Sequence, residues 1–256
     1  MRKIWVLCAL ILGLAAPAFA FDHSHQVLGE VLSKSVVNQG AASKVDYGWL
    51  KQHPAGLQAY VRQISGVSLR EFDRWDEPQQ VAFLINSYNA LTLKLILTKY
   101  PKLDSIKDIG GFFSSPWKQE FFTLLGEIHS LDAVEHQWLR GRFQRPRVHF
   151  AIVCASVGCP ALNDVPFLAT TLDVQLQAAK LRFLGDRSRN RYDRTTQTLH
   201  LSKIFDWFAD DFSGSAGSVA AFVAEGVTDD RAELERINAA QVKIEFLDYD
   251  WSLNKR

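Results

Sequence analysis

The sequence is poor in cysteine, has no excess of either charge, and lacks a long hydrophobic run after its first twenty residues. It carries 29 Lys and Arg against 28 Asp and Glu, so its charge gives no reason to expect nucleic acid as a partner. Without a second hydrophobic run, no membrane span is expected beyond the start of the chain. Repeats and low-complexity tracts are absent from the sequence as well.

The first twenty residues have the three parts of a secretory signal. Arg2 and Lys3 form a basic start, residues 4–16 are apolar, and Ala18-Phe19-Ala20 ends in the small residues that signal peptidase accepts. The apolar stretch is shorter than the roughly 20 residues that a membrane span needs. We therefore predict a signal peptide over residues 1–20 and a soluble mature protein over residues 21–256, located in the periplasm or secreted.

The mature chain then holds two cysteines, Cys154 and Cys159, because Cys8 lies in the predicted signal. Both occur in H-F-A-I-V-C-A-S-V-G-C-P, residues 149–160, where a short apolar run meets a Gly/Pro turn. The run over residues 149–154 is typical of a strand buried on both faces. Thiols in an oxidising compartment usually pair, so a structural disulfide is one interpretation. A reactive thiol at the strand-to-loop junction is a second, and a pair of inert or redox-labile cysteines is a third.

A nucleophilic thiol needs a base within reach. If residues 149–154 are a strand, His149 lies roughly 16 Å from Cys154, at about 3.3 Å per residue, and on the opposite face. His149 would then meet Cys159 only if the loop folds back along its strand. His136 is expected on a separate helix, where Asp132, four residues earlier, can orient its imidazole. Glu135 is adjacent to His136 on that helix and is therefore expected to point elsewhere. We therefore predict a dyad of His136 with Cys154 or Cys159; the alternative is a structural histidine bound to backbone.

Asn86 and Asn89 lie three residues apart on a strongly apolar helix and so share one face. A buried amide without partners costs on the order of 1 to 3 kcal/mol, so each is expected to bind something. They are either site residues, as oxyanion donors or orienters of a histidine, or clamps on a neighbouring loop.

The pattern of helices and hairpins shows no regular β-α-β alternation, which predicts a single α+β domain with a buried helix packed on a mixed or antiparallel sheet, hairpins and peripheral helices. A terminal strand is expected at 242–247 and a flexible joint at 213–217. Expected helices begin near residues 26, 57, 76, 130, 172, 202 and 218, the last being the final clear helix, and hairpins are expected at 120–130 and 192–201.

Several long motifs, in order over nearly the whole mature chain, resemble the domain-of-unknown-function 547 family. They are F-L-I-N-S-Y-N-A-L-T (83–92), S-I-K-D-I-G-G (105–111), L-D-A-V-E-H-Q-W-L-R (131–140), H-F-A-I-V-C-A-S-V-G-C-P (149–160), L-S-K-I-F-D-W-F-A-D-D-F (201–212) and D-Y-D-W-S-L-N (248–254). The pair Phe83-Leu84 stands where the family often has Phe-Trp. The resemblance implies a single domain and supplies no reaction or catalytic residue.

Other site types have weaker sequence signals. Signal cleavage would leave Phe21-Asp22-His23, and a free amine with His23 in third place is a Cu(II)-binding pattern. No ligand spacing matches a zinc site, and we predict no cofactor. Aromatic residues either line a groove for a peptide or glycan or belong to the core; they are Phe112, Phe113, Trp117, Phe121, Trp138, Trp207 and Trp251.

Together these patterns predict a cleft where the helix with Asn86 and Asn89, the helix with His136, and the loop with Cys154 and Cys159 converge. One hypothesis is a thiol-dependent hydrolase or acyltransferase that acts on a peptide-like envelope substrate. The other is a non-catalytic binding or envelope-assembly module whose two cysteines form a structural disulfide. Either protein would bind a small-molecule or peptide-like ligand.

Overall fold

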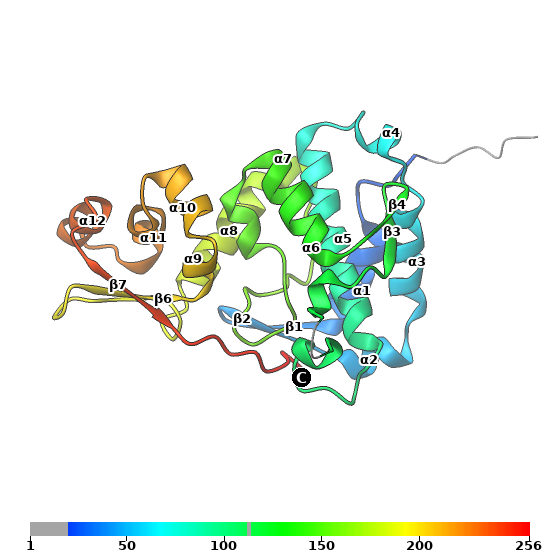
Figure 1. Cartoon of the computed structure of the whole chain (residues 1–256), viewed down its shortest axis with the longest axis horizontal. Helices are drawn as coiled ribbons and strands as arrows, with labels where there is room; N and C mark the ends of the chain where they lie inside the picture. Colours follow the sequence, from blue (N-terminus) through cyan, green and yellow to red (C-terminus); the bar gives the residue numbers. More distant parts are fainter. Residues whose placement is uncertain (1–19, 112–113) are drawn as a thin grey trace, which may run out of the picture.

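The computed structural model describes residues 20–111 and 114–256, and the fold is of the α+β class, as predicted. Two hydrophobic cores lie side by side. The larger is built by residues from Leu28 to Leu176 and by Leu253, and the smaller by Phe150 and residues from Ala179 to Ile237. Figure 1 shows the corresponding two lobes, with α1 to α7 in one, α9 to α12 in the other, and α8 between them.

Helix α5 (Glu77–Leu97) forms the centre of the larger lobe. Asp76 caps its start by accepting a hydrogen bond from the Gln79 N–H at 2.8 Å, and the Gln79 side chain accepts one from the Asp76 N–H in return. Almost every side chain from Gln80 to Ile96 is buried, because α2 (Tyr47–Gln52), α3 (Ala55–Ser65) and the segment over residues 134–140 pack around it.

Both asparagines on α5 bind backbone on neighbouring loops. The Asn86 side chain donates to the Phe167 carbonyl at 2.8 Å and accepts from the Phe167 N–H at 3.0 Å. Asn89 donates to the Ala151 carbonyl at 2.9 Å and accepts from the Val153 N–H at 3.0 Å. Each amide therefore pairs two backbone groups that would otherwise be buried without a partner, which is the clamp arrangement.

The hairpin of β1 (Val36–Gln39) and β2 (Ala42–Val45) was not predicted. The spacing of apolar residues predicted a first helix over residues 26–38. The observed helix α1 (Gln26–Ser35) stops before Val36, whose backbone has the β conformation. The chain turns at Gly40, which has φ +60°, a conformation that glycine adopts without steric cost.

The predicted strand over residues 149–154 is wrong. The segment begins as the 3-10 helix η4 (Pro146–Phe150), opened by proline, and continues as a turn without strand pairing in the described chain. It is buried because it passes between the two cores, not because it lies in a sheet. A short apolar run reports burial on all sides, and periodicity alone does not distinguish a strand from a buried turn.

The segment over residues 120–143, which precedes η4, agrees with the prediction at its start and differs from it at its end. Strands β3 (Phe122–Leu124) and β4 (Glu127–His129) form the expected hairpin. Ser130 then caps α6 (Leu131–Ala133), which widens into the π-helical stretch η3 (Val134–Arg140) before the short α7 (Gly141–Phe143). Two further 3-10 turns, η1 (Ile106–Ile109) and η2 (Pro116–Lys118), and the short α4 (Leu69–Phe72) complete this lobe.

The smaller lobe pairs helices with one three-stranded sheet. After η5 (Ala169–Thr171) and α8 (Leu172–Leu184), β5 (Arg191–Asp193) pairs antiparallel with β6 (Thr198–Ser202), and β6 pairs parallel with β7 (Lys243–Leu247). The helix expected from 202 to 212 is two helices, α9 (Ile204–Trp207) and α10 (Ala209–Ala216). The expected joint at 213–217 is therefore wrong. Helix α11 (Val219–Val227) is followed by α12 (Arg231–Asn238), which the pattern missed.

After β7 the chain crosses back from the smaller lobe to the larger one (Figure 1). This C-terminal segment, residues 248–256, is fixed by backbone hydrogen bonds to the Cys154–Cys159 loop: Gly158 donates to Asp250 at 2.8 Å, and Val157 donates to Ser252 at 2.8 Å. Further along, Val45 of β2 donates to Asn254 at 2.9 Å. The crossing places Tyr249 and Trp251 beside that loop.

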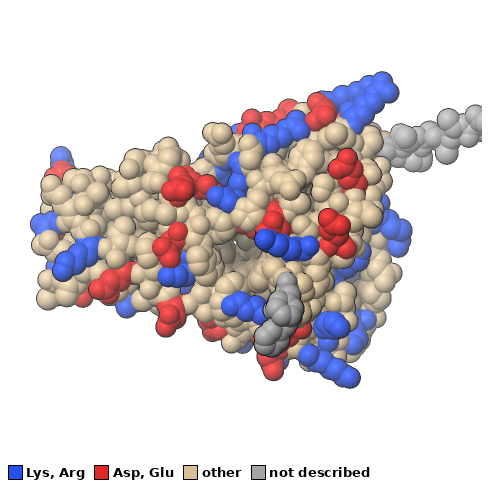
Figure 2. Space-filling model, viewed as in Figure 1, with Lys and Arg blue, Asp and Glu red and all other residues tan. Residues whose placement is uncertain are grey.

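None of the helices in residues 20–111 and 114–256 is both long and apolar enough to cross a membrane. Figure 2 shows Lys and Arg interspersed with Asp and Glu over the visible face, without a large patch of one sign.

The clamp on Ala151 and Val153 gives the first prediction. Asn89→Ala leaves a buried N–H and a buried carbonyl unpaired, so we expect a loss of about 3 kcal/mol in the free energy of unfolding, measured by urea denaturation. Ser87→Ala is the matched control on the same helix, because the Ser87 hydroxyl is buried and has no hydrogen-bond partner among the described residues. We expect it to cost nothing. Equal stability of the two variants would contradict the clamp.

Candidate functional site

A pocket of about 220 Å³ opens between the two lobes. Figure 2 shows a hollow near the middle of the visible face, where the lobes meet. Its walls come from α5, the η2 region, α6 and η3, η4, the disulfide loop, α9 and the C-terminal segment. The lining residues are Tyr88, Ser115, Trp117, Asp132, Glu135, His136, His149, Ile152, Cys154, Cys159, Pro160, Ile204, Trp207, Phe208, Tyr249 and Trp251.

The pocket brings together three of the five site residues expected from the sequence: His136, Cys154 and Cys159. Asn86 and Asn89 do not line it, since both are used as loop clamps. His149, which the strand interpretation placed on the wrong face, lines the pocket because η4 and the following turn direct it there.

His149 is bound to an aspartate from the other lobe. Its Nε2 lies 2.7 Å from Oδ2 of Asp211 on α10, and its ring stacks on Phe208 with centroids 4.0 Å apart. Asp211 also accepts two hydrogen bonds from Arg140, at 2.6 and 2.9 Å. These donors, His149 first and Arg140 next, hold the pKa of Asp211 far below its usual range, so Asp211 is a carboxylate and His149 donates to it through Nε2–H.

Glu135 lies on the other side of the same imidazole. Its Oε1 is 4.0 Å from His149 Nδ1, and the Tyr88 hydroxyl donates to its Oε2 at 3.3 Å. The Glu135 side chain is only 12% exposed, and burial raises its pKa to about 7, against the opposing effects of Tyr88 and Arg140. Burial also lowers the pKa of His149, even though Asp211 favours the charged ring. The imidazole is therefore neutral and presents an unprotonated Nδ1 towards Glu135.

A carboxyl group that titrates near neutrality next to a neutral imidazole can take up and release a proton. The protonated acid can donate to a ligand, and the ionised form can accept a proton from water or from a ligand. Asp211 and Arg140 fix the imidazole and its tautomer, in the way that a carboxylate fixes a catalytic histidine in hydrolase triads.

His136 is arranged differently from the predicted dyad. Arg140 donates to its Nδ1 at 2.5 Å, and its Nε2 lies 3.7 Å from Oδ1 of Asp132. Partial burial lowers the pKa of His136, against the opposing effect of Asp132. The predicted proximity of Asp132 to His136 is thus present, but the imidazole belongs to the Arg140 cluster at the edge of the pocket.

Cys154 and Cys159 form a disulfide, so neither is a free thiol in this form of the protein. The Tyr249 hydroxyl lies 3.1 Å from the sulfur of Cys154 and 3.2 Å from that of Cys159. The disulfide and this hydroxyl form one wall of the pocket.

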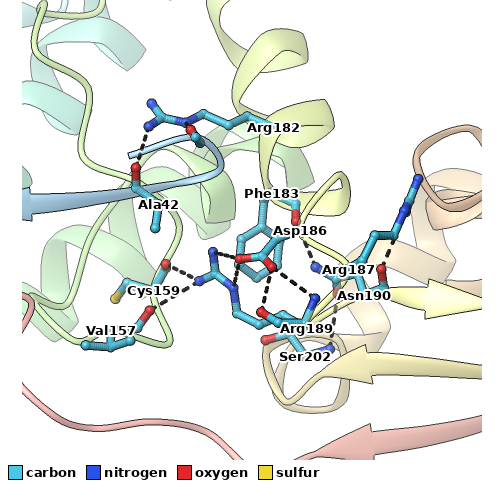
Figure 3. A network of polar contacts seen from close by, with 12 residues as sticks. Ala42, Val157, Cys159, Arg182, Phe183, Asp186, Arg187, Arg189, Asn190 and Ser202 are labelled. Carbon is cyan, nitrogen blue, oxygen red and sulfur yellow. Dashed lines mark hydrogen bonds and ion pairs between the residues drawn. The ribbon is translucent and has the colours of Figure 1, made fainter. Parts of the chain in front are cut away.

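The loop that carries the disulfide is held from the smaller lobe by Arg189 (Figure 3). Its guanidinium donates to the Cys159 carbonyl at 2.6 Å and to the Val157 carbonyl at 3.3 Å, and pairs with Asp186 at 2.6 Å. Arg182 makes a similar link from α8 to the β1–β2 hairpin, with a 2.7 Å bond to the Ala42 carbonyl. Since Asn89 of α5 also binds the Val153 N–H, the segment that carries the disulfide is held from both lobes.

The aromatic residues named from the sequence divide between the pocket and the core. Trp117, Trp207 and Trp251 line the pocket. Phe121 and Trp138 pack against the larger core. Phe112 and Phe113 lie outside the described residues.

The N-terminal copper pattern requires a free amine at Phe21, which exists only after cleavage, so it stays a prediction. In the uncleaved chain, the Phe21 N–H donates to Glu71 at 3.0 Å, and the His23 ring packs edge-on against Trp75 with centroids 4.5 Å apart. Within the described residues, no group of three or more His, Cys, Asp or Glu side chains is placed to hold a metal ion.

Three residues of the site were missed by the sequence analysis: Asp211 was not considered as a site residue, and Glu135 and His149 were set aside. A signal for them existed, since each lies in one of the long motifs, 131–140, 149–160 and 201–212. Glu135 was placed away from His136 by α-helical spacing, whereas both line the pocket from the π-helical stretch η3.

Residues 72–184 match the family described as "Protein of unknown function, DUF547", which confirms the resemblance seen in the sequence. The matched region contains Glu135, His149 and both cysteines, whereas Asp211 and Tyr249 lie beyond it. No curated protein and no solved structure matches the chain.

The second prediction concerns the proton on Glu135. Because the pKa of Glu135 is about 7, its carboxyl group should be protonated below that pH and ionised above it. Infrared difference spectra should show the carbonyl stretch of a carboxylic acid that disappears as the pH rises through about 7. The band should be missing in Glu135→Gln and retained in Glu127→Gln, which alters an exposed glutamate of β4. A band that survives Glu135→Gln would assign the proton elsewhere.

Proposed function

We propose that the pocket is the active site of a hydrolase that acts on a small peptide-like acyl compound, with Glu135 and His149 as its proton-transfer pair. The observation that carries this proposal is the position of Glu135. Its carboxyl group lines the pocket, titrates near neutrality, and lies beside a neutral imidazole held by the partly exposed Asp211–Arg140 ion pair. A general acid or base works best when its pKa is close to the working pH.

The proposed reaction uses water as the nucleophile. Ionised Glu135 accepts a proton from water while the water oxygen bonds to the acyl carbon. The same proton then passes to the leaving nitrogen or oxygen as the acyl bond breaks. The products are a carboxylic acid and an amine or alcohol, and Glu135 returns to its ionised form. His149 Nδ1 is the second proton acceptor available in the pocket.

A thiol-dependent version of the same chemistry is the second candidate. It is favoured by the position of Cys154, which lines the pocket together with His136 and His149. It requires that the disulfide first be reduced, because only the thiolate is nucleophilic. A non-catalytic binding module would use the same pocket without either step, so an activity measurement separates it from both enzymes.

We also propose that the protein works in an oxidising compartment, the periplasm or the extracellular medium. The disulfide supports this, because such bonds persist in exported proteins and are rare in the cytosol. The signal-like pattern of residues 1–20 supports it independently. The N-terminal sequence of the protein recovered from a periplasmic extract, expected to begin at Phe21, tests this proposal.

The third prediction tests the mechanism on a panel of small aminoacyl amides and esters. Glu135→Gln should lower kcat by about 10²- to 10⁴-fold, the range that a lost general acid or base costs. Glu127→Gln should leave kcat unchanged. Activity should fall as the pH drops below about 7, because protonated Glu135 cannot act as a base.

The double variant Cys154→Ser/Cys159→Ser separates the two enzymatic candidates. Water-based hydrolysis by Glu135 should survive in it, after a melting experiment has shown that it is folded. Activity that appears only after reduction of the wild-type protein, and is lost in the double variant, would support the thiol mechanism and contradict the one proposed. If neither the oxidised nor the reduced wild-type protein hydrolyses any member of the panel, the hydrolase proposal fails.

A further inference from the structure

We infer that the pocket recognises a ligand through an ammonium group, held between the aromatic side chains of the C-terminal segment and α9 and the carboxylate of Asp132. This inference deepens the proposed function and relies on it only for the statement that the bound ligand is also the substrate. The binding preference itself follows from the wall and the charges of the pocket.

Three rings form the aromatic wall: Trp207, Tyr249 and Trp251. Their centroids are 4.9 Å apart for Trp207 and Tyr249, 5.5 Å for Trp207 and Trp251, and 4.5 Å for Tyr249 and Trp251. Trp207 remains 44% exposed although tryptophan is usually much more buried, so part of its surface is available to a ligand. Adjacent Trp and Tyr rings attract cations through their negative faces, and such groups recognise ammonium ligands.

The charges of the pocket select the same kind of ligand. Among the described residues that line it, none is Lys or Arg, whereas Asp132 and Glu135 are both acidic. Arg140 does not line the pocket, and its charge is balanced by that of Asp211, to which it donates two hydrogen bonds. Above about pH 7 the lining therefore holds two acidic side chains and the imidazoles of His136 and His149, with no Lys or Arg among its described residues.

The protein already places one of its own ammonium groups on this wall. Lys107 Nζ lies 3.7 Å from the centroid of the Trp251 ring, although Lys107 does not line the pocket. The contact shows that the ring of Trp251 accepts an ammonium group in this fold. A neutral ligand would use the rings but would gain nothing from Asp132.

The test compares two probes of the same shape. Choline and 3,3-dimethylbutan-1-ol differ in the charge of one central atom, so the difference in their affinities measures recognition of that charge. We expect choline to bind at least about tenfold more tightly in calorimetric titrations, since a desolvated cation–aromatic contact is worth on the order of 1 to 2 kcal/mol. Quenching of tryptophan fluorescence should accompany its binding.

Two variants assign the effect to the pocket. Asp132→Asn should weaken choline binding and leave binding of the neutral alcohol unchanged, and Trp207→Leu should weaken choline binding more than binding of the alcohol. Glu127→Gln is the surface control and should change neither. Equal affinity for the two probes, no detectable binding of choline, or choline binding that survives both variants would overturn the inference.

The source of the ammonium group is resolved by competition. Alaninamide carries a free amine next to an acyl carbon, and N-acetylalaninamide does not. Displacement of choline by the first compound alone would point to the free amine of a peptide-like ligand, and displacement by neither would point to a quaternary ammonium compound.

These outcomes are independent of catalysis. Selective choline binding without hydrolysis of any substrate would remove the proposed function and keep the inference. Hydrolysis without preference for a cationic substrate or probe would contradict the inference and leave the proposed function in place.

Discussion

The arrangement of the pocket depends on one partly exposed carboxylate, that of Asp211. It comes from α10 in the smaller lobe and accepts hydrogen bonds from His149 and Arg140, both of which belong to segments of the larger lobe. Removing this carboxylate would leave the buried His149 Nε2–H without its partner, which costs free energy because the His149 side chain is only 1% exposed. The same contacts that join the lobes therefore also fix the imidazole that faces Glu135.

Two local departures from regular secondary structure position the remaining titratable side chains of the pocket. The π-helical stretch η3 directs both Glu135 and His136 into the pocket, and the turn that begins with η4 does the same for His149. Single-turn π-helical segments often occur at functional sites, since their geometry aligns side chains that an α-helix would separate. Neither departure has a sequence signature: α-helical spacing separated Glu135 from His136, and strand spacing placed His149 and Cys154 on opposite faces.

What the sequence does predict is local. The start of α5 follows from Asp76, Pro78 and Gln79, whose capping interactions involve only neighbouring residues, and the hairpin of β5 and β6 follows from short alternating runs and a turn. The return of the C-terminal segment across the pocket, which brings in Tyr249 and Trp251, depends on backbone hydrogen bonds to the loop of Cys159, about ninety residues earlier. No pattern within one segment predicts such a long-range contact. The sequence therefore indicated which aromatic residues are present, but not that some of them form one wall of a pocket.

The disulfide and the carboxyl group have separate roles in this arrangement. The bond between Cys154 and Cys159 closes a small loop that Arg189 and the C-terminal segment already hold in place, so most of the loop's geometry does not depend on it. The pKa of Glu135, in contrast, is set by burial and by groups from α5, α6, η3 and α10 together. We expect Glu135, whose carboxyl group the fold keeps in an unfavourable environment, to perform the proposed chemistry. Burying an ionisable carboxyl group opposes folding when it ionises, and a fold retains that cost where function requires it.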